Sequence, residues 1–263
     1  MRAMNALVAT RDARIETIAE GRGPPVVILP SRGRGAEDYD EVARGIAEAG
    51  YRVVRPQPRG IGKSTGPMKA LTLHDLARDV AAVIAHEAAE HAGGPAVVVG
   101  HAFGNWVARM TAADHPKLVR GVAILAAAAK KYPAALAEAV TRCADASLPR
   151  AERLKYLQLA FFAPGHDASG WLEGFYPEVN ASQRAAGLAT PQEAWWSAGS
   201  VPLLDLQAAL DPFRPRETEN DLREELGARV SVVTIPEAGH ALVPEQPQAV
   251  VAALLGWMKN LRV

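Results

Sequence analysis

Residues 95–104 read PAVVVGHAFG, an apolar run that ends in a segment with glycine at both ends. The β-branched run indicates a buried strand, and the helical pattern that begins near Phe103 follows it directly. Gly100 and Gly104 allow a sharp turn and close packing between strand and helix. We therefore expect Ala102, midway between them, to occupy a strained backbone conformation at the amino terminus of the helix.

The same alternation of strand and helix extends to both sides of this stretch. Further strand candidates lie at 24–30, 51–56, 121–128, 201–207 and 229–236, and helical patterns lie at 37–50, 72–92, 220–227 and 247–261. Such alternation favours parallel strands joined by crossover helices, and nearly all-apolar strands favour a sheet covered on both faces. The sequence predicts an α/β fold with a doubly wound, mostly parallel sheet.

The alternation stops over residues 131–200, where helical pieces are broken by LPR, APGHD, YPEVN and ATPQ and no strand pattern is present. It resumes at residue 201. We therefore predict an α/β core made of residues 1–130 and 201–263, and a helical cap made of residues 131–200 that lies over the sheet.

Composition narrows the classes of partner. The 263 residues are 49% hydrophobic and 22% charged, and 29 Lys and Arg balance 29 Asp and Glu, so the net charge favours neither nucleic acid nor a membrane surface. A single Cys excludes an internal disulfide, and the amino terminus lacks an apolar region of signal-peptide length. No apolar run reaches the ~18 residues of a membrane span. We expect a cytoplasmic protein with a small-molecule ligand.

Three loops after strand candidates carry residues suited to catalysis. GHAFG matches the nucleophile-elbow pattern G-x-S-x-G except that Ala102 stands at the nucleophile position. Asp211 follows the strand candidate at 201–207, and His240 follows the one at 229–236. In this order of nucleophile position, acid and histidine, the chain resembles the α/β-hydrolase superfamily, in particular its capped single-domain members, from about Pro24 to Met258.

The resemblance implies a role for each position. His240 would be a general base held by Asp211, with Asp205 as the alternative acid. The oxyanion-hole donors would be the backbone N–H of Phe103 and that of Gly33 or Arg32, because Pro30-Ser31-Arg32-Gly33 stands where the family often has His-Gly. Residues 59–64, RGIGKS, look like the family's R-G-x-G-x-S loop. They do not fit a phosphate-binding loop, because residue 57 is Gln where the first glycine is needed.

Side chains for substrate binding are expected around this site. Arg32, Arg34 and Arg59 fall in loops that should border its mouth, where guanidinium groups suit carboxylates, although they are equally suited to a solvated surface. An apolar pocket could be lined by aromatic residues of the cap, which otherwise pack the cap onto the core: Trp195, Trp196, Phe161 and Phe162. Cys143 and Ser31 are the alternative nucleophiles. No cofactor or metal is expected, because the histidines lack metal-ligand spacing.

Three hypotheses follow from the methyl group at position 102. The chain is a serine-type hydrolase in which Ala102 is an introduced substitution, and a restored hydroxyl would return activity. Alternatively, Ala102 is native and His240 acts as a general base in hydrolysis or in lyase-type proton abstraction, without a covalent intermediate. In the third hypothesis the chain is a non-catalytic binder. We favour a hydrolase lineage acting on a small, partly apolar ester or other carbonyl compound.

Overall fold

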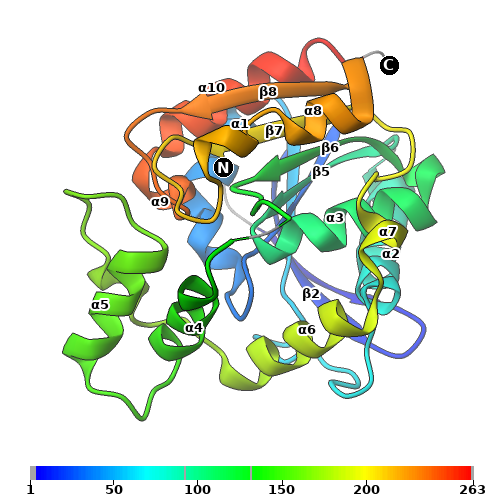
Figure 1. The fold of residues 1–263 in the computed structure, drawn as a ribbon. Coiled ribbons are helices and arrows are strands. Elements are labelled where there is room, and N and C mark those ends of the chain that lie inside the picture. Colours follow the sequence, from blue (N-terminus) through cyan, green and yellow to red (C-terminus); the bar gives the residue numbers. More distant parts are fainter. Residues whose placement is uncertain (1–3, 92, 131, 262–263) are drawn as a thin grey trace.

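The computed structural model describes residues 4–91, 93–130 and 132–261. Its eight strands form one sheet (Figure 1) and are β1 (Met4–Ala9), β2 (Arg14–Gly21), β3 (Pro25–Leu29), β4 (Arg52–Pro56), β5 (Ala96–His101), β6 (Val119–Leu125), β7 (Leu203–Ala208) and β8 (Val230–Ile235). The strand order is β1-β2-β4-β3-β5-β6-β7-β8, and the pairs from β4 to β8 are all parallel. The predicted mostly parallel, doubly wound α/β sheet is confirmed.

Helices cover both faces of the sheet. One face carries α1 (Asp40–Glu48), α9 (Leu242–Glu245) and α10 (Pro247–Met258), and the other carries α2 (Leu73–His91), α3 (Phe103–Asp114), α7 (Gln192–Trp195) and α8 (Asp221–Leu226). Alternate residues of β5 divide between the two layers, because successive side chains of a strand point to opposite faces. Val98 packs in one apolar layer, and Val97 and Val99 pack in the other.

The strand order reverses beside β3, which lies between β4 and β5. In an open α/β sheet, ligands bind at such a reversal, outside the carboxyl ends of the strands. The loop after β3 and the turn after β5 therefore meet at the place where this fold is expected to hold a site.

An antiparallel hairpin at one edge of the sheet was missing from the sequence-based expectations. β1 pairs with β2, and β2 continues the sheet by pairing antiparallel with β4. Of the residues of β1 only Val8 is buried, so β1 lacks the apolar run that marks the central strands. A solvent-facing edge strand gives a weak pattern, since one face of it has no core to contact.

Between β6 and β7 the described residues contain helices and no strand. They are α4 (Ala134–Cys143), α5 (Arg150–Ala160), α6 (Pro177–Ala189) and α7, and Figure 1 shows α4 and α5 standing beside the sheet. The start of the predicted cap, residue 131, lies outside the described residues. Over the described ranges, no helix combines the length and the apolar character needed to cross a bilayer.

Candidate active site

The turn between β5 and α3 forces one residue into an unusual backbone conformation. Ala102 has φ 48° and ψ −113°, in a region that non-glycine residues seldom occupy. Its N–H donates to the carbonyl oxygen of Leu125 at 3.0 Å, and its own carbonyl oxygen accepts the backbone N–H of Asn105 at 3.1 Å. The side chain of residue 102 is therefore held at the amino terminus of α3.

The two glycines of this turn lie against backbone atoms. A Cβ on Gly104 would lie 2.4 Å from the carbonyl oxygen of Leu29 and 2.7 Å from that of Pro30. A Cβ on Gly100 would lie 2.3 Å from the carbonyl oxygen of Gly104. Only a hydrogen atom fits at either position. Because glycine has no side chain, α3 can begin directly against β3 and β5.

A buried carboxylate orients the histidine that follows β8. His240 Nδ1 lies 2.9 Å from Asp211 Oδ2, and the other carboxylate oxygen accepts the N–H of Phe213 at 2.8 Å. An ionised carboxylate only accepts, so Nδ1 carries the proton and Nε2 is the acceptor of the neutral ring. Asp205, the alternative acid, instead pairs with Arg214 at 2.9 Å.

A second histidine connects the three loops of the site. His101 Nε2 lies 2.7 Å from the carbonyl oxygen of His240, which can only accept, so Nε2 carries the proton. His101 Nδ1 then accepts from the hydroxyl of Tyr39 at 2.7 Å, and this hydroxyl accepts the N–H of Ser31 at 2.9 Å. The loops after β3, β5 and β8 are thereby joined through buried hydrogen bonds.

This arrangement predicts a loss of stability in mild acid. Burial, together with the charge of His240, lowers the pKa of His101 to about 3. The unfolded chain takes up the proton near pH 6.5 whereas the folded chain does not, so stability falls as pH drops below 6.5, by about 1.4 kcal/mol per pH unit. Between pH 6.5 and 4.5, urea unfolding should show that the free energy of unfolding falls more steeply with pH for the wild type than for His101→Gln. Parallel pH profiles for the two proteins would contradict this assignment.

Two backbone N–H groups beside the turn at Ala102 are candidates for binding an oxyanion. The N–H of Phe103 belongs to the first turn of α3 and has no intrahelical acceptor. In the described part of the chain the N–H of Arg32 likewise has no acceptor, whereas that of Gly33 donates to Gln183 Oε1 at 2.7 Å. Of the two alternatives left open by the sequence, the N–H of Arg32 is therefore the better candidate, because that of Gly33 is already bonded.

A cavity of about 460 Å³ brings these groups together. Ala102, His240 and Phe103 line it, with Arg32 and Ser31 from the loop after β3. The helical segment contributes much of the rest of the wall: Ala137, Glu138, Val140, Thr141, Phe161, Arg184, Gly187 and Leu188. Its volume is within the range of ordinary small-molecule sites, which is about 300–1,000 Å³.

Residues 26–253 match the family model described as "Alpha/beta hydrolase family". The chain belongs to this family. Among curated proteins it is 30% identical over 112 residues to a soluble epoxide hydrolase from a Corynebacterium species, which is 43% of this chain and 37% of that protein. It is 32% identical over 120 residues to a pyrrolizixenacetamide deacetylase from Xenorhabdus hominickii, which is 46% of this chain and 44% of that protein.

The matched region thus spans less than half the length of these curated relatives. Solved structures agree over nearly the whole chain. An esterase from Exiguobacterium antarcticum has a TM-score of 0.80 at 20% identity and covers 98% of this chain and 100% of its own. An E-2-(acetamidomethylene)succinate hydrolase has a TM-score of 0.78 at 18% identity, and the match covers 98% of this chain and 100% of that protein. At these identities the likeness establishes the fold.

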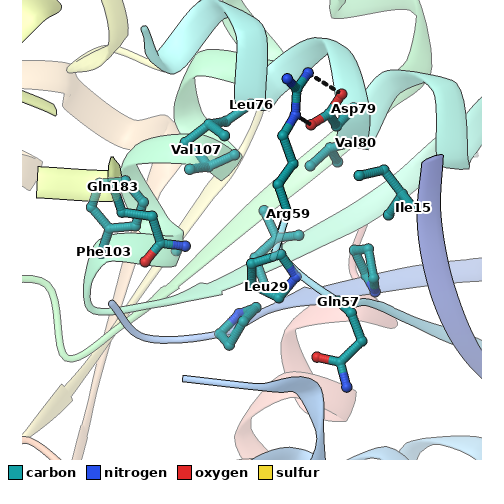
Figure 2. A pocket seen from close by; sticks show the side chains of 14 residues that line it. Ile15, Leu29, Gln57, Arg59, Leu76, Asp79, Val80, Phe103, Val107 and Gln183 are labelled. Carbon is teal, nitrogen blue, oxygen red and sulfur yellow. Dashed lines mark hydrogen bonds and ion pairs between the residues drawn. The ribbon is translucent and has the colours of Figure 1, made fainter. Parts of the chain in front are cut away.

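In this family member Arg59 lies away from the cavity of Ala102 and His240, which corrects the prediction that it borders the same site. Its guanidinium is bonded to Asp79 at 2.7 and 2.9 Å and to Asp12 at 2.7 Å. In Figure 2 the Arg59–Asp79 pair lies on one side of a smaller apolar cavity that both residues line, with Phe103 on the other side. The volume of this cavity is about 60 Å³. The ion pair attaches the RGIGKS loop to α2.

The other predicted residues divide between the cavity wall and the packing of the helices. Phe161 lines the cavity and lies 5.5 Å from the ring of His240. Phe162, Trp195 and Trp196 do not line it, because Phe162 packs edge-on against Trp171 and the two tryptophans are buried against the layer that contains α3.

Arg34 and Cys143 are also directed elsewhere. Arg34 is buried and pairs with Asp38 at 2.6 Å, so it is not free to bind a ligand at the mouth of the site. Cys143 is fully buried among apolar side chains, and burial raises the pKa of its thiol to about 12. A thiol in that state is a poor nucleophile. The described residues contain no group of three His, Cys, Asp or Glu placed as metal ligands would be.

Sequence reasoning missed several residues of the site. Asn105 and Trp106 line the cavity from α3, three and four positions after Ala102, on the helical face that continues from the turn. This spacing from Ala102 could have predicted that both residues face the site. No sequence pattern could have predicted Tyr39 and Gln183, because they reach the loop after β3 only through the tertiary arrangement.

Proposed function

We propose that this chain hydrolyses a small, partly apolar ester or related carbonyl compound without a covalent enzyme intermediate. The observation that carries the proposal is the hydrogen bond of 2.9 Å between Asp211 and His240, which leaves Nε2 of a buried histidine as a proton acceptor in the cavity of Ala102. A methyl group cannot attack a carbonyl, so the nucleophile is water. His240 is its general base.

In the proposed reaction, His240 Nε2 takes a proton from water while the water oxygen bonds to the carbonyl carbon. The carbonyl oxygen, on which negative charge develops, accepts hydrogen bonds donated by the N–H groups of Phe103 and Arg32. When the tetrahedral intermediate collapses, its bond to the leaving oxygen breaks and that oxygen takes the proton from the imidazolium. The products are the acid and the alcohol, and Asp211 stabilises the imidazolium between the two steps.

The helices between β6 and β7 support a capped site in this proposal. Side chains of α4 and α6 form part of the cavity wall, opposite the turns of the sheet that carry Ala102 and His240. A cap of this kind excludes water other than the reacting molecule and gives the substrate apolar surface. The partly apolar character of the substrate is inferred from lining residues such as Val140, Phe161 and Phe213.

The names of the relatives indicate which bonds to test. They include epoxide hydrolases and an amide-cleaving deacetylase. A first panel therefore comprises 4-nitrophenyl esters with acyl chains of two to eight carbons, the matching acetanilide, and styrene oxide.

His240→Ala should lower kcat/KM for any substrate of the panel by roughly 10²–10⁴-fold, because general-base catalysis contributes about that much. His74→Ala is the matched control, since His74 is an exposed histidine that pairs with Asp114 at the surface. Circular dichroism establishes that both variants are folded. Unchanged turnover in His240→Ala would refute the proposal, and binding of panel compounds without turnover in the wild type would favour the non-catalytic binder.

A further inference from the structure

A second cavity adjoins the one that contains His240. Its volume is about 240 Å³, and the two share five lining residues: Asn105, Trp106, Ala128, Tyr132 and Gly187. At its other end lie Arg109, Lys130 and the indole rings of Trp195 and Trp196. A ligand that fills both cavities would pass along the side of α3.

Arg109 is the charged side chain buried in this second cavity. Only 1% of its surface is exposed, and its guanidinium lies 4.6 Å from the centre of the Trp196 ring. One terminal nitrogen donates to the carbonyl oxygen of Trp196 at 3.1 Å, while Nε has no partner among the described residues. A guanidinium has five N–H donors, so most of its capacity is unused.

Among the described residues, no carboxylate lies within ion-pair distance of Arg109. Asp205 and Glu225 are the acidic groups whose charges act on Arg109, yet Asp205 is paired with Arg214 at 2.9 Å and Glu225 with Lys130 at 2.7 Å. Within the described chain neither forms an ion pair with Arg109. Burial lowers the pKa of Arg109 to about 10, which still leaves it charged at neutral pH. Buried charges are normally paired, so an unpaired one that lines a cavity favours an anionic ligand.

A further donor lies in the same cavity. Trp195 Nε1 is buried and has no hydrogen-bond acceptor in the part of the chain that the structure describes. An indole N–H is a donor only, and a buried one usually finds an acceptor. Arg109 and Trp195 therefore both carry donors without an acceptor in the wall of this cavity, and the terminal nitrogens of Arg109 are the donors that a carboxylate in it would contact.

We infer that the second cavity binds the carboxylate end of the substrate, with Arg109 as its partner, so that the substrate is a monoester of a dicarboxylic acid or a similar acyl compound with a distal acid. The inference rests on the proposed function for the place of the reacting carbonyl beside Ala102. Arg109 follows Ala102 by seven residues on α3, which corresponds to about 10 Å at a rise of 1.5 Å per residue. A chain of about eight carbons spans that distance.

The test is direct binding of octanoate and of octan-1-ol, measured by calorimetry and by tryptophan fluorescence. Octanoate should bind the wild type more tightly than octan-1-ol. Arg109→Met should lower the affinity for octanoate by roughly 10- to 100-fold and leave the affinity for octan-1-ol nearly unchanged. Arg109→Lys should retain part of the preference. Arg44→Met, which removes an exposed charge from α1 on the opposite face of the sheet, is the matched control.

The inference would be overturned if the two probes bound the wild type with equal affinity. It would also be overturned if Arg109→Met lowered the affinity for both probes by the same factor. We expect Arg109→Met to fold, because replacing a buried charge by an apolar residue of similar length often leaves stability unchanged. Binding of octanoate should survive in His240→Ala, so the result does not depend on turnover. If the chain is a hydrolase, monomethyl octanedioate should exceed methyl octanoate in kcat/KM, and this preference should vanish in Arg109→Met.

Discussion

Ala102→Ser should increase hydrolysis of 4-nitrophenyl acetate by at least about a hundredfold and should produce a covalent acetyl-enzyme. Loss of the nucleophile from an evolved triad costs on the order of a millionfold in kcat, so a partial return of that factor is expected from a site not selected for serine. The backbone at position 102 already has φ 48°, and the acceptor nitrogen of His240 lines the same cavity. Serine adds one oxygen to a side chain that is already in place.

Rates and mass spectrometry of the acylated protein check this prediction. The gain should depend on the histidine, so adding His240→Ala to the Ala102→Ser variant should abolish it and bring the rate down to that of the single His240→Ala variant. Ser31→Ala in the Ala102→Ser background is the control for the serine hydroxyl already present in the cavity, and it should keep the gain. If the serine variant forms no acyl-enzyme and gains no activity, the backbone donors and His240 are not aligned on a common carbonyl, and the proposed reaction geometry is wrong.

Gly104→Ala should lower the free energy of unfolding by at least about 3 kcal/mol. The added Cβ would meet the carbonyl oxygens of Leu29 and Pro30 at 2.4 and 2.7 Å, and these are backbone atoms of the central sheet that have no alternative rotamer. Relief requires α3 to move away from β3. The change would also displace Phe103 and the turn at Ala102.

Gly256→Ala is the matched control, because Gly256 lies in α10 and a Cβ there meets nothing within 4 Å. It should raise stability by up to about 1 kcal/mol, since alanine has a higher helix propensity than glycine. Urea unfolding of the two variants beside the wild type measures both effects. Similar stability for Gly104→Ala and the wild type would show that the close approach of α3 to β3 is not required.

Much of the fold was predictable from the sequence because its signals are local. β3, β5 and β7 are fully buried, and each lies within or overlaps a strand expected from residue pattern alone, although β5 extends to His101 and β7 to Ala208. The hairpin of β1 and β2 was not predictable in the same way, since a half-exposed edge strand has little apolar pattern. The expected cytoplasmic location and the expected lack of a cofactor stay predictions.

For the candidate site, residue order along the chain was enough to indicate which loops could carry it. Ala102, Asp211 and His240 each follow a strand of the parallel sheet, and in this fold such positions lie at one edge. The glycines at 100 and 104 are equally local requirements, because only a residue without Cβ fits where strand and helix touch. These properties depend on order along the chain and on the geometry of a single turn.

The pairing of the charged side chains, in contrast, depends on how distant segments pack together. Arg34, Arg59 and Arg109 are alike in the sequence, yet Arg34 and Arg59 are bound to carboxylates and Arg109 is buried with no ion pair among the described residues. The partners of these residues lie on other elements, and the free energy of a buried charge depends on the groups packed around it. Charge pairing between distant segments is set when the sheet and helices pack, which is why residue pattern alone could not separate a structural arginine from one available to a ligand.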